Sequence, residues 1–416
     1  MHQESQEFKK FVADCKNSKY KSPLEVDPKI FRLEDWNYLT RTQAEDLFLP
    51  FIRYNIERSL KTMPDVYLKP YREAGISPES IESIEDFWRV PPIPKDSGGG
   101  YVGLREKVLQ TGYGIVEPND IEKKGGVASA YFSGGTMGIS VPTFVTEFDL
   151  QVEAFASYRA LIATGIKQGS VVINTYNTSH KGGEVIGRAL KQLSGSHYIQ
   201  VRSNDLIKHI SEHITRSSRH ERELLFVGTQ PPIKEEDSQQ KGSGRTLFDL
   251  IRNYAPIYQE HVDRILLGGF RIIPEVEHIS KAEGPLSKPI TTIFGSTEIM
   301  PAFFGTPFEA ENPDKLCVFN NLHTMFGPHY IEVIKFDDRH KMWKPAKVGE
   351  RGVLALTSVF REGTLYNRYL IGDSARILRE EKECECSKTL NEILTDITRI
   401  GKEGEEELIL TGCAAL

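Results

Sequence analysis

A glycine-rich stretch at residues 131–140, YFSGGTMGIS, has the composition of a loop that wraps backbone amides around a phosphate. The N–H groups of such a turn, with the hydroxyls of Ser133 and Thr136, donate hydrogen bonds to phosphate oxygens. Loops of this kind usually carry a lysine, and Ile139 stands where that positive charge is expected. The P-loop pattern and the nucleophile elbow of hydrolases are both absent, so the stretch predicts a different phosphate site.

Two later stretches carry carboxylates that suit the rest of a nucleotide. In FGSTEIMPAFFG, Glu298 follows a strand-like run, where a carboxylate can hold Mg²⁺ beside a hydroxyl that contacts phosphate. In RYLIGD, Asp373 follows a strand and a glycine and is suited to accept hydrogen bonds from both ribose hydroxyls. A glutamate on a solvated loop and an aspartate in a turn remain the plain alternatives.

Cysteine and histidine form a further candidate site. Cys384 and Cys386 are separated by one residue, and Cys317 and His323 lie within one short segment. Three thiols and an imidazole are the soft and borderline ligands of a tetrahedral structural zinc site. By spacing alone, unrelated thiols are the alternative.

The elements that must position these residues alternate between strand and helix. Apolar or β-branched runs predict strands at 170–176, 223–229, 264–269 and 290–295. Helical patterns lie between them at 149–166, 182–195 and 246–264. This alternation predicts an α/β fold with a largely parallel sheet, and ligand sites in such sheets lie outside the carboxyl ends of the strands.

The regions on either side of this core differ from it. Residues 1–125 have a helical pattern, including a helix that starts at Pro78 behind the capping residue Ser77, with Ile81, Ile84 and Phe87 on one face. Charged turns separate strand-like runs after 328, which predict a small antiparallel β subdomain. We therefore expect four segments: a helical part at 1–125, the α/β core at 126–327, the β-rich subdomain at 328–400 and a remnant of an interdomain hinge at 401–416.

Composition limits the class of protein. The 416 residues are 39% hydrophobic and 26% charged, as in ordinary globular proteins. A formal net charge of −6 argues against a nucleic-acid partner, and no apolar run is long enough to span a bilayer. The polar start is unlike a secretion signal, and five cysteines suit a reducing compartment, so we expect a soluble cytoplasmic protein without a membrane partner.

Four motifs in order, FSGGTMG, LLGGF, FGSTE and NRYLIGD, resemble the core motifs of the adenylate-forming superfamily of acyl-CoA synthetases, adenylation domains and luciferases. The chain is most similar to the phenylacetate–CoA ligase branch, and the resemblance runs from about residue 60 almost to the end. It implies the large N-terminal domain of such an enzyme, with parallel sheets flanked by helices and a small β subdomain. It also implies that the C-terminal small domain is largely missing.

The resemblance assigns roles position by position. The catalytic residues would be Thr136, Thr297, which touches the α-phosphate, and Glu298, which holds Mg²⁺. ATP or AMP would be bound by Ser133, Gly134, Gly135, Gly138, Gly269, Phe270, Phe294, Gly295, Ser296, Arg368, Asp373 and Lys402. The carboxylic acid would be bound by Tyr176, His180, Gly183 and Gly268. The cysteines and His323 fall where the branch often has metal-binding elements, which favours Zn²⁺.

The departures from the family pattern matter equally. Ile139 replaces the loop lysine, Leu370 and Ile371 alter the ribose motif, and Lys402 stands where the hinge normally has arginine. The expected loss of the C-terminal domain would remove the lysine used in adenylation. These departures favour an enzyme that forms the acyl-adenylate slowly and transfers the acyl group to CoA poorly.

Three functions follow, of which the first is preferred. The first is ATP-dependent activation of an aryl or acyl carboxylic acid to its adenylate with release of pyrophosphate, in a biosynthetic pathway. The second is a complete aryl- or acyl-CoA ligase, which leaves CoA open as a substrate. The third is a non-catalytic relative that binds nucleotide or an acyl ligand. The resemblance also implies a homodimer and a partner protein that accepts or reduces the acyl group.

Overall fold

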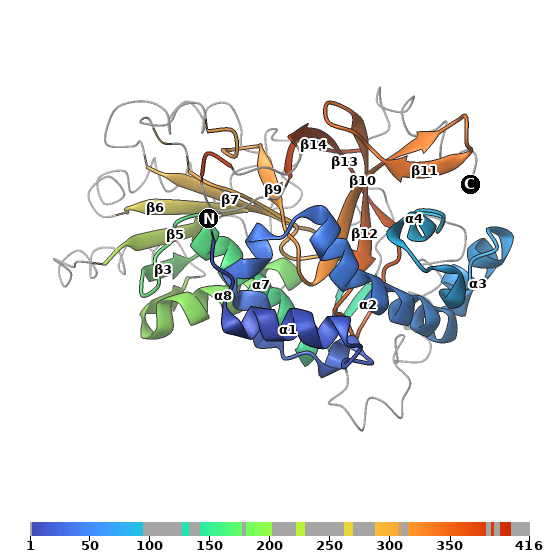
Figure 1. The fold of residues 1–416 in the computed structure, drawn as a ribbon. Coiled ribbons are helices and arrows are strands. Elements are labelled where there is room, and N and C mark those ends of the chain that lie inside the picture. Colours follow the sequence, from blue (N-terminus) through green and yellow to red (C-terminus); the bar gives the residue numbers. More distant parts are fainter. Residues whose placement is uncertain are drawn as a thin grey trace. The chain divides into compact units, whose positions relative to one another are not determined.

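The computed structural model describes residues 2–94, 127–132, 142–176, 180–201, 222–228, 262–268, 288–307, 309, 315–379, 384–386 and 392–400. The chain divides into two compact units. The first contains 1–156, 324–382 and 390–416, and the second contains 157–323 and 383–389. This division differs in kind from the four segments expected from the sequence, and those segments remain predictions. Figure 1 labels many of the elements of the two units.

Helices dominate the start of the first unit. Its α-helices are α1 (Gln6–Lys16), α2 (Arg41–Thr62), α3 (Pro64–Glu73) and α4 (Ile84–Phe87), with short 3₁₀ turns at Pro23–Glu25, Pro28–Arg32, Glu34–Tyr38 and Pro78–Ser80. A capping box starts α2, because the Thr40 hydroxyl accepts from the Gln43 amide and the Gln43 side chain accepts from the Thr40 amide. Within the described ranges, each helix is too short or too polar to cross a bilayer.

The helix expected from Pro78 onward is wrong as a continuous element. A 3₁₀ turn ends at Ser80, and α4 begins only at Ile84. Ser83 interrupts the helix because its hydroxyl accepts from the Asp86 amide, while the Asp86 carboxylate accepts from the Ser83 amide. This second capping box starts a new helix where the apolar spacing alone indicates continuation.

Aromatic side chains fill the core beneath these helices. Phe8, Phe31 and Trp36 are fully buried, and the Phe31 ring meets Phe360 edge-on with centroids 4.8 Å apart. Trp36 also stacks on Phe48 and donates from its indole N–H to the Ile30 carbonyl at 3.1 Å. Burying this much aromatic area is the main stabilisation of the helical region.

The first unit also contains two antiparallel sheet portions. One pairs β1 (Val127–Phe132) with β2 (Pro142–Thr146). The other has the strand order β11-β10-β12-β13-β14, formed by Met342–Pro345, His329–Asp337, Arg351–Ser358, Tyr369–Arg379 and Ile393–Arg399. The antiparallel strands expected after residue 328 are therefore confirmed.

The second unit contains the parallel strands. Its strand order is β9-β8-β7-β6-β5-β3-β4, formed by Leu322–Thr324, Phe303–Gly305, Ile290–Phe294, Arg264–Gly268, Leu224–Gly228, Val171–Asn174 and Tyr198–Gln200. The strands from β7 to β4 are parallel, which confirms the four expected strands and their direction. The last residue of β9 already belongs to the first unit.

Helix α7 (Glu147–Ala163) and helix α8 (Lys181–Ser194) match the expected ranges 149–166 and 182–195. The division between the two units falls within α7, after Ala156, whereas α8 belongs to the second unit and lies beside β3 (Figure 1). Gly195, with a φ of 60°, follows α8 as its C-cap, a backbone conformation that favours glycine. A 3₁₀ turn, Gly195–His197, leads into β4. Most of the third expected helix, 246–264, lies outside the described residues, and its last residues, 262–264, are not helical.

A buried ion pair holds the first unit together where α4 ends. Arg368 and Glu332 are both completely buried, with Nε and Oε2 3.3 Å apart. The same guanidinium donates to the backbone carbonyls of Trp88 at 2.6 Å and Val90 at 2.8 Å. Arg368 thus ties the chain after α4 to strands β10 and β13.

Removing Glu332 should leave a buried, unpaired charge. We expect Glu332→Ala to lower the free energy of unfolding by about 3–5 kcal/mol, measured by urea denaturation. The matched control is Glu350→Ala, which breaks the exposed pair with Lys335 and should cost no more than about 1 kcal/mol. Equal losses in the two variants would contradict the structural role of the buried pair.

Candidate functional site

Three predicted site segments meet at one edge of the parallel sheet. Strands β3, β6 and β7 run in the same direction, so their carboxyl ends lie on the same side of the sheet. Tyr176 follows β3, Gly268 ends β6 and Gly295 follows β7. This edge is where open α/β sheets bind their ligands.

The predicted substrate-binding residues are neighbours there. A Cβ atom on Gly268 would lie 3.6 Å from the Tyr176 ring. That ring packs edge-on against His180, with the centroids 5.0 Å apart. Burial raises the pKa of Tyr176 to about 12, so its phenol stays neutral and can donate a hydrogen bond.

His180 also has a structural task at the start of α8. Its Nδ1 accepts a hydrogen bond from the Gly183 amide at 3.1 Å, so the ring acts as the N-cap of the helix. Burial of the ring lowers its pKa, which favours the neutral imidazole that this cap requires. The predicted contact of His180 and Gly183 with substrate stays a prediction.

The turn after β7 carries the predicted phosphate and magnesium ligands. The Ser296 amide donates to the Ile299 carbonyl, and the Ala302 amide donates to the Phe294 carbonyl, both at 2.8 Å. Glu298 is buried in this turn, and Thr297 is partly exposed. The Ser296 hydroxyl is buried without a hydrogen-bond partner among the described residues. A carboxylate and free hydroxyl capacity at a sheet edge are a donor set that fits Mg²⁺ and phosphate.

Sequence reasoning missed Lys181, the first residue of α8. Its side chain is completely buried, and Nζ donates to the backbone carbonyl of Glu298 at 3.1 Å. In the sequence it reads as an ordinary surface lysine beside His180. The available signal was a cation at the positive end of a helix, where the helix dipole disfavours it.

Among the described residues, two predicted nucleotide ligands, Arg368 and Asp373, belong to the first unit. Arg368 is occupied by Glu332 and two backbone carbonyls, as described above. The expectation that Asp373 follows a strand is wrong, because it lies inside β13, where it is paired with Arg399 and buried. The preceding Gly372 has a φ of 86°, and the β12–β13 register shifts nearby, which marks a bulge.

The remaining predicted residues lie outside the described part of the chain. They are Ser133, Gly134, Gly135, Thr136 and Gly138 of the phosphate loop, with Gly269, Phe270 and Lys402. Their roles stay predictions.

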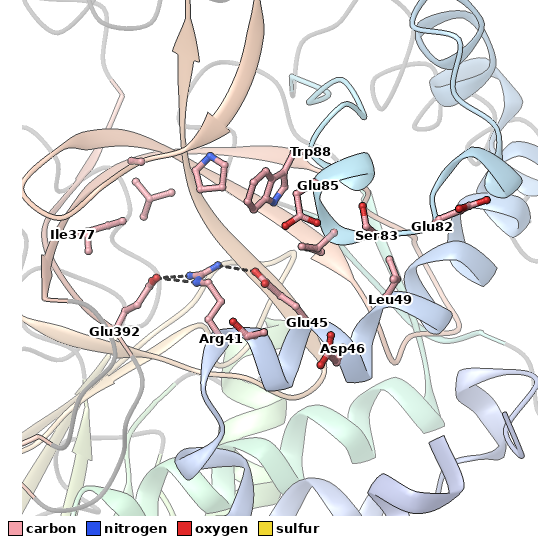
Figure 2. Close-up of a pocket in the computed structure, with 15 residues that line it drawn as sticks. Arg41, Glu45, Asp46, Leu49, Glu82, Ser83, Glu85, Trp88, Ile377 and Glu392 are labelled. Atoms are coloured by element: carbon pink, nitrogen blue, oxygen red, sulfur yellow. Dashed lines mark hydrogen bonds and ion pairs between the residues drawn. The ribbon is translucent and has the colours of Figure 1, made fainter. Parts of the chain in front are cut away.

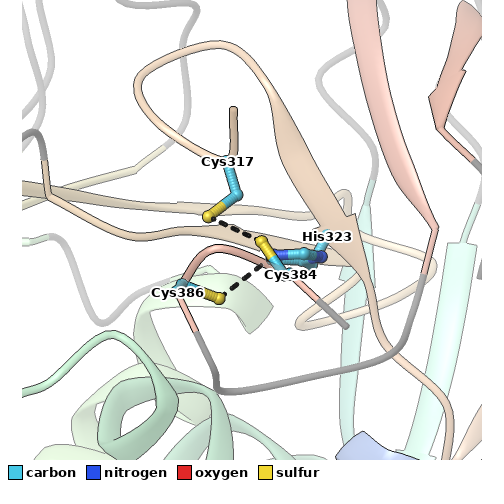
Figure 3. Close-up of side chains that lie close together, drawn as sticks. All are labelled: Cys317, His323, Cys384 and Cys386. Carbon is cyan, nitrogen blue, oxygen red and sulfur yellow. Dashed lines mark hydrogen bonds between the residues drawn. The ribbon is translucent and has the colours of Figure 1, made fainter. Parts of the chain in front are cut away.

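The predicted zinc ligands meet in the second unit (Figure 3). The ligand atoms of Cys317, His323, Cys384 and Cys386 all lie within 4.8 Å of one another. The sulfurs of Cys317 and Cys384 are 3.5 Å apart, and Cys386 Sγ is 3.6 Å from His323 Nε2. Two sulfurs on one tetrahedral zinc lie about 3.8 Å apart, given Zn–S bonds of about 2.3 Å. The cluster therefore has the ligands and the size for that ion.

Hydrogen bonds within the cluster shift the pKa values of its side chains in different directions, and those to Cys317 and Cys384 raise the pKa of Cys386. Those from Cys317 and Cys386 lower the pKa of Cys384 below its ordinary range, and thiolate is the form that ligates zinc. Burial alone would lower the pKa of His323, but hydrogen bonds with Cys317 and Cys384 raise it to about 9 in the metal-free cluster. Thr306 Oγ1 lies 3.1 Å from Cys317 Sγ and supports that thiol from outside the cluster.

A cavity of about 680 Å³ in the first unit has a different character (Figure 2). Arg41 lies in its wall and pairs with Glu392 at 2.6 Å and Glu45 at 3.8 Å. Asp46 and Glu85 add further negative charge to the lining. Among the residues that the structure describes, no predicted nucleotide or substrate residue lines this cavity. Since carboxylates predominate, it is unsuited to the phosphates of ATP.

Comparisons with known proteins identify the fold. The chain is similar to two crystal structures of 2-hydroxyisobutyryl-CoA ligase, each at a TM-score of 0.64 and 17% identity. One is an open form and the other is the thioesterification state, and both hold the acyl-adenylate and CoA. The matches cover 91% of this chain and 81% and 74% of those chains. The post-adenylation state gives a TM-score of 0.59 at 16% identity, over 86% of this chain and 67% of that chain.

Comparisons of the amino-acid sequence gave no match: neither a family model nor a curated protein matches it. The structural likeness confirms the predicted α/β fold, which the chain shares with these ligase structures. At this level of identity it shows the fold and leaves the chemistry to be argued from the site.

The close packing of the turn after β7 can be tested by the effect of a substitution at Gly295 on stability. A Cβ on Gly295 would lie 2.3 Å from Met300 Sδ and 2.7 Å from the Ile299 carbonyl oxygen. We expect Gly295→Ala to lower the free energy of unfolding by about 1–3 kcal/mol, because the turn must open. Gly268→Ala is the control, since its Cβ would meet only ordinary contacts at 3.4 Å or more. Similar urea midpoints for both variants would contradict this geometry.

Proposed function

We propose that the protein is an ATP-dependent ligase that activates a small carboxylic acid, aryl or acyl, as its acyl-adenylate. A carboxylate oxygen attacks the α-phosphorus of ATP and forms a new P–O bond. The bond from that phosphorus to the oxygen bridging to the β-phosphate breaks, and pyrophosphate leaves with the electron pair. The product is a mixed anhydride of the acid and AMP.

One observation carries the proposal. The chain has the fold of a ligase whose structures hold an acyl-adenylate, and its own candidate residues gather at the carboxyl edge of the parallel sheet. In the proposal, Tyr176 and Gly268 border the acid at this edge. Thr297 donates to the α-phosphate from the turn after β7. Glu298 would hold Mg²⁺, which neutralises phosphate charge when bound.

The remaining proposed roles fall to sequence motifs elsewhere in the chain. The amides of the glycine loop, with Thr136, would bind the phosphates, and Asp373 would bind the ribose. Ile139 replaces the usual lysine, so less positive charge faces the leaving pyrophosphate. A missing positioned charge slows a reaction that develops negative charge.

ATP–pyrophosphate exchange tests the reaction directly. We expect exchange with at least one acid from a panel of aryl acids, fatty acids and short hydroxy acids. Glu298→Gln should lower kcat by about 10²–10³-fold, because it weakens the proposed carboxylate ligand of the Mg²⁺ that would neutralise charge on the reacting phosphates. Glu57→Gln, at an exposed glutamate on α2, should leave exchange unchanged. Absence of exchange with every acid, together with no ATP binding, would refute the activity.

Two alternatives give different results in the same assay. AMP release that depends on CoA would identify a complete acyl-CoA ligase, the reaction to which the names of the similar structures refer. Binding of nucleotide or acid without exchange would identify a non-catalytic relative. The buried Glu298 beside free hydroxyl capacity favours a catalytic site over the second alternative.

The finer assignments belong to the proposal as well. We place the protein in the phenylacetate–CoA ligase-like branch on its sequence motifs, in a biosynthetic role, in the cytoplasm and as a homodimer. A partner protein would accept or reduce the acyl group.

We also propose that Cys317, His323, Cys384 and Cys386 bind a structural zinc ion. Three thiols and one imidazole within 4.8 Å support a closed tetrahedral site, and a closed site stabilises a fold rather than performing catalysis. The ion would join the segment before β9 to the segment that contains Cys384. The two segments lie more than sixty residues apart in the sequence, with a separation of 67 between Cys317 and Cys384.

Metal analysis tests this centre without any activity assay. Protein expressed in zinc-supplemented medium should contain about one zinc per chain, and Cys384→Ser should lose most of it. Cys15→Ala is the matched control, because Cys15 is a buried cysteine in α1 outside the cluster. Clearly substoichiometric zinc in the wild type, or equal zinc in both variants, would contradict the site.

A further inference from the structure

Lys181 occupies a position that is unfavourable for a cation in two ways. It is the first residue of α8, where the unpaired amides of the helix give a positive potential. Its side chain is also completely buried, and removing an ammonium group from water is costly. A residue with both disadvantages needs a compensating interaction.

The structure shows such an interaction with the predicted magnesium ligand. Lys181 Nζ donates to the backbone carbonyl of Glu298 at 3.1 Å, in the buried interior of the second unit. A hydrogen bond from a charged donor is stronger than one between neutral groups, and more so away from water. The bond therefore anchors the turn at the residue that matters for the proposed chemistry.

The first turn of α8 and the turn after β7 are in close contact around this bond. A Cβ on Gly182 would lie 3.7 Å from Met300 Sδ and 3.6 Å from the His180 ring. The same methionine sulfur closes over Gly295 at the other end of the turn. The hydrogen bond from Lys181 thus joins the first turn of α8 to the turn after β7, where the two turns pack against each other.

We propose that Lys181 is a positioning residue, which holds the backbone of the turn from Gly295 to Met300 so that Thr297 and Glu298 face the reacting phosphates. The proposal rests on the proposed function for its catalytic consequence. Lys181 acts through the Glu298 carbonyl and need not touch substrate. Its loss should allow the turn to open and displace both side chains together, and small displacements of aligned groups slow reactions strongly.

Hydrogen exchange measures the positioning without reference to activity. In Lys181→Met, the amides of Ser296 and Ala302, which the turn protects, should exchange at least about tenfold faster than in the wild type. Lys181→Arg retains a charged donor and should restore much of the protection. Lys191→Met is the matched control, because Lys191 is an exposed lysine on the same helix and should change nothing in the turn.

Kinetics then separates positioning from simple support of the fold. We expect Lys181→Met to lower kcat for ATP–pyrophosphate exchange by about 10–10²-fold and to raise the Mg²⁺ concentration needed for half-maximal rate. The KM for ATP should change much less, and Lys181→Arg should recover activity. An active Lys181→Met enzyme with an unchanged Mg²⁺ requirement would overturn the catalytic part.

The two measurements also distinguish this proposal from the proposed function. If the wild type exchanges with no acid, the proposed function fails, while hydrogen exchange still decides whether Lys181 holds the turn. Unchanged amide exchange in Lys181→Met would overturn the positioning role even in a fully active enzyme. If Lys181→Met does not fold, Lys181→Gln, which keeps a neutral donor, is measured in the same way and should show intermediate protection.

Discussion

A charged group that leaves water must find partners inside the protein, and this constraint shapes both units. In the first unit, Arg368 is completely buried and divides its donors between Glu332 and the carbonyls of Trp88 and Val90. In the second, Lys181 is completely buried and donates to the carbonyl of Glu298. In each case the partners come from distant parts of the chain, so satisfying the charge also fixes how those segments pack.

At the carboxyl edge of the parallel sheet, neutral groups pack closely against one another. Gly268 and Gly295 have no side chain, which lets the Tyr176 ring and the Met300 side chain approach the strand ends closely. The turn after β7 closes on itself through two backbone hydrogen bonds, which leaves Glu298 buried and Thr297 partly exposed. A ligand at this edge would meet a preformed surface, and a preformed surface lowers the cost of ordering on binding.

The cysteine–histidine cluster joins two segments of the second unit. Cys317 and His323 come from one segment and Cys384 and Cys386 from the other, and their four ligand atoms lie within 4.8 Å of one another. A metal ion bound at such a site would stabilise the fold. The acidic cavity around Arg41 and Glu392 belongs to the first unit and is chemically opposite to a phosphate site.

Much of the architecture follows from local sequence. Apolar runs such as 290–295 separated by helical stretches require parallel strands with crossover helices, and that arrangement places Tyr176, Gly268 and Gly295 at one edge. The residue types of the cluster at Cys384 indicated zinc ligands with unrelated thiols as the alternative, and the resemblance favoured zinc; the four ligand atoms do meet. These features depend on periodicity and on residue chemistry, which the sequence displays directly.

Only the tertiary structure decided the rest. It placed Asp373 within β13 at a bulge rather than after a strand, because pairing with β12 and β14 extends that strand beyond Gly372. The break before Ser83 is local by comparison, because the capping box that Ser83 forms with Asp86 competes with the apolar spacing. The tertiary structure also buried Lys181 against the carbonyl of Glu298, 117 residues away in the sequence. The sequence near Lys181 carries no record of so distant a partner.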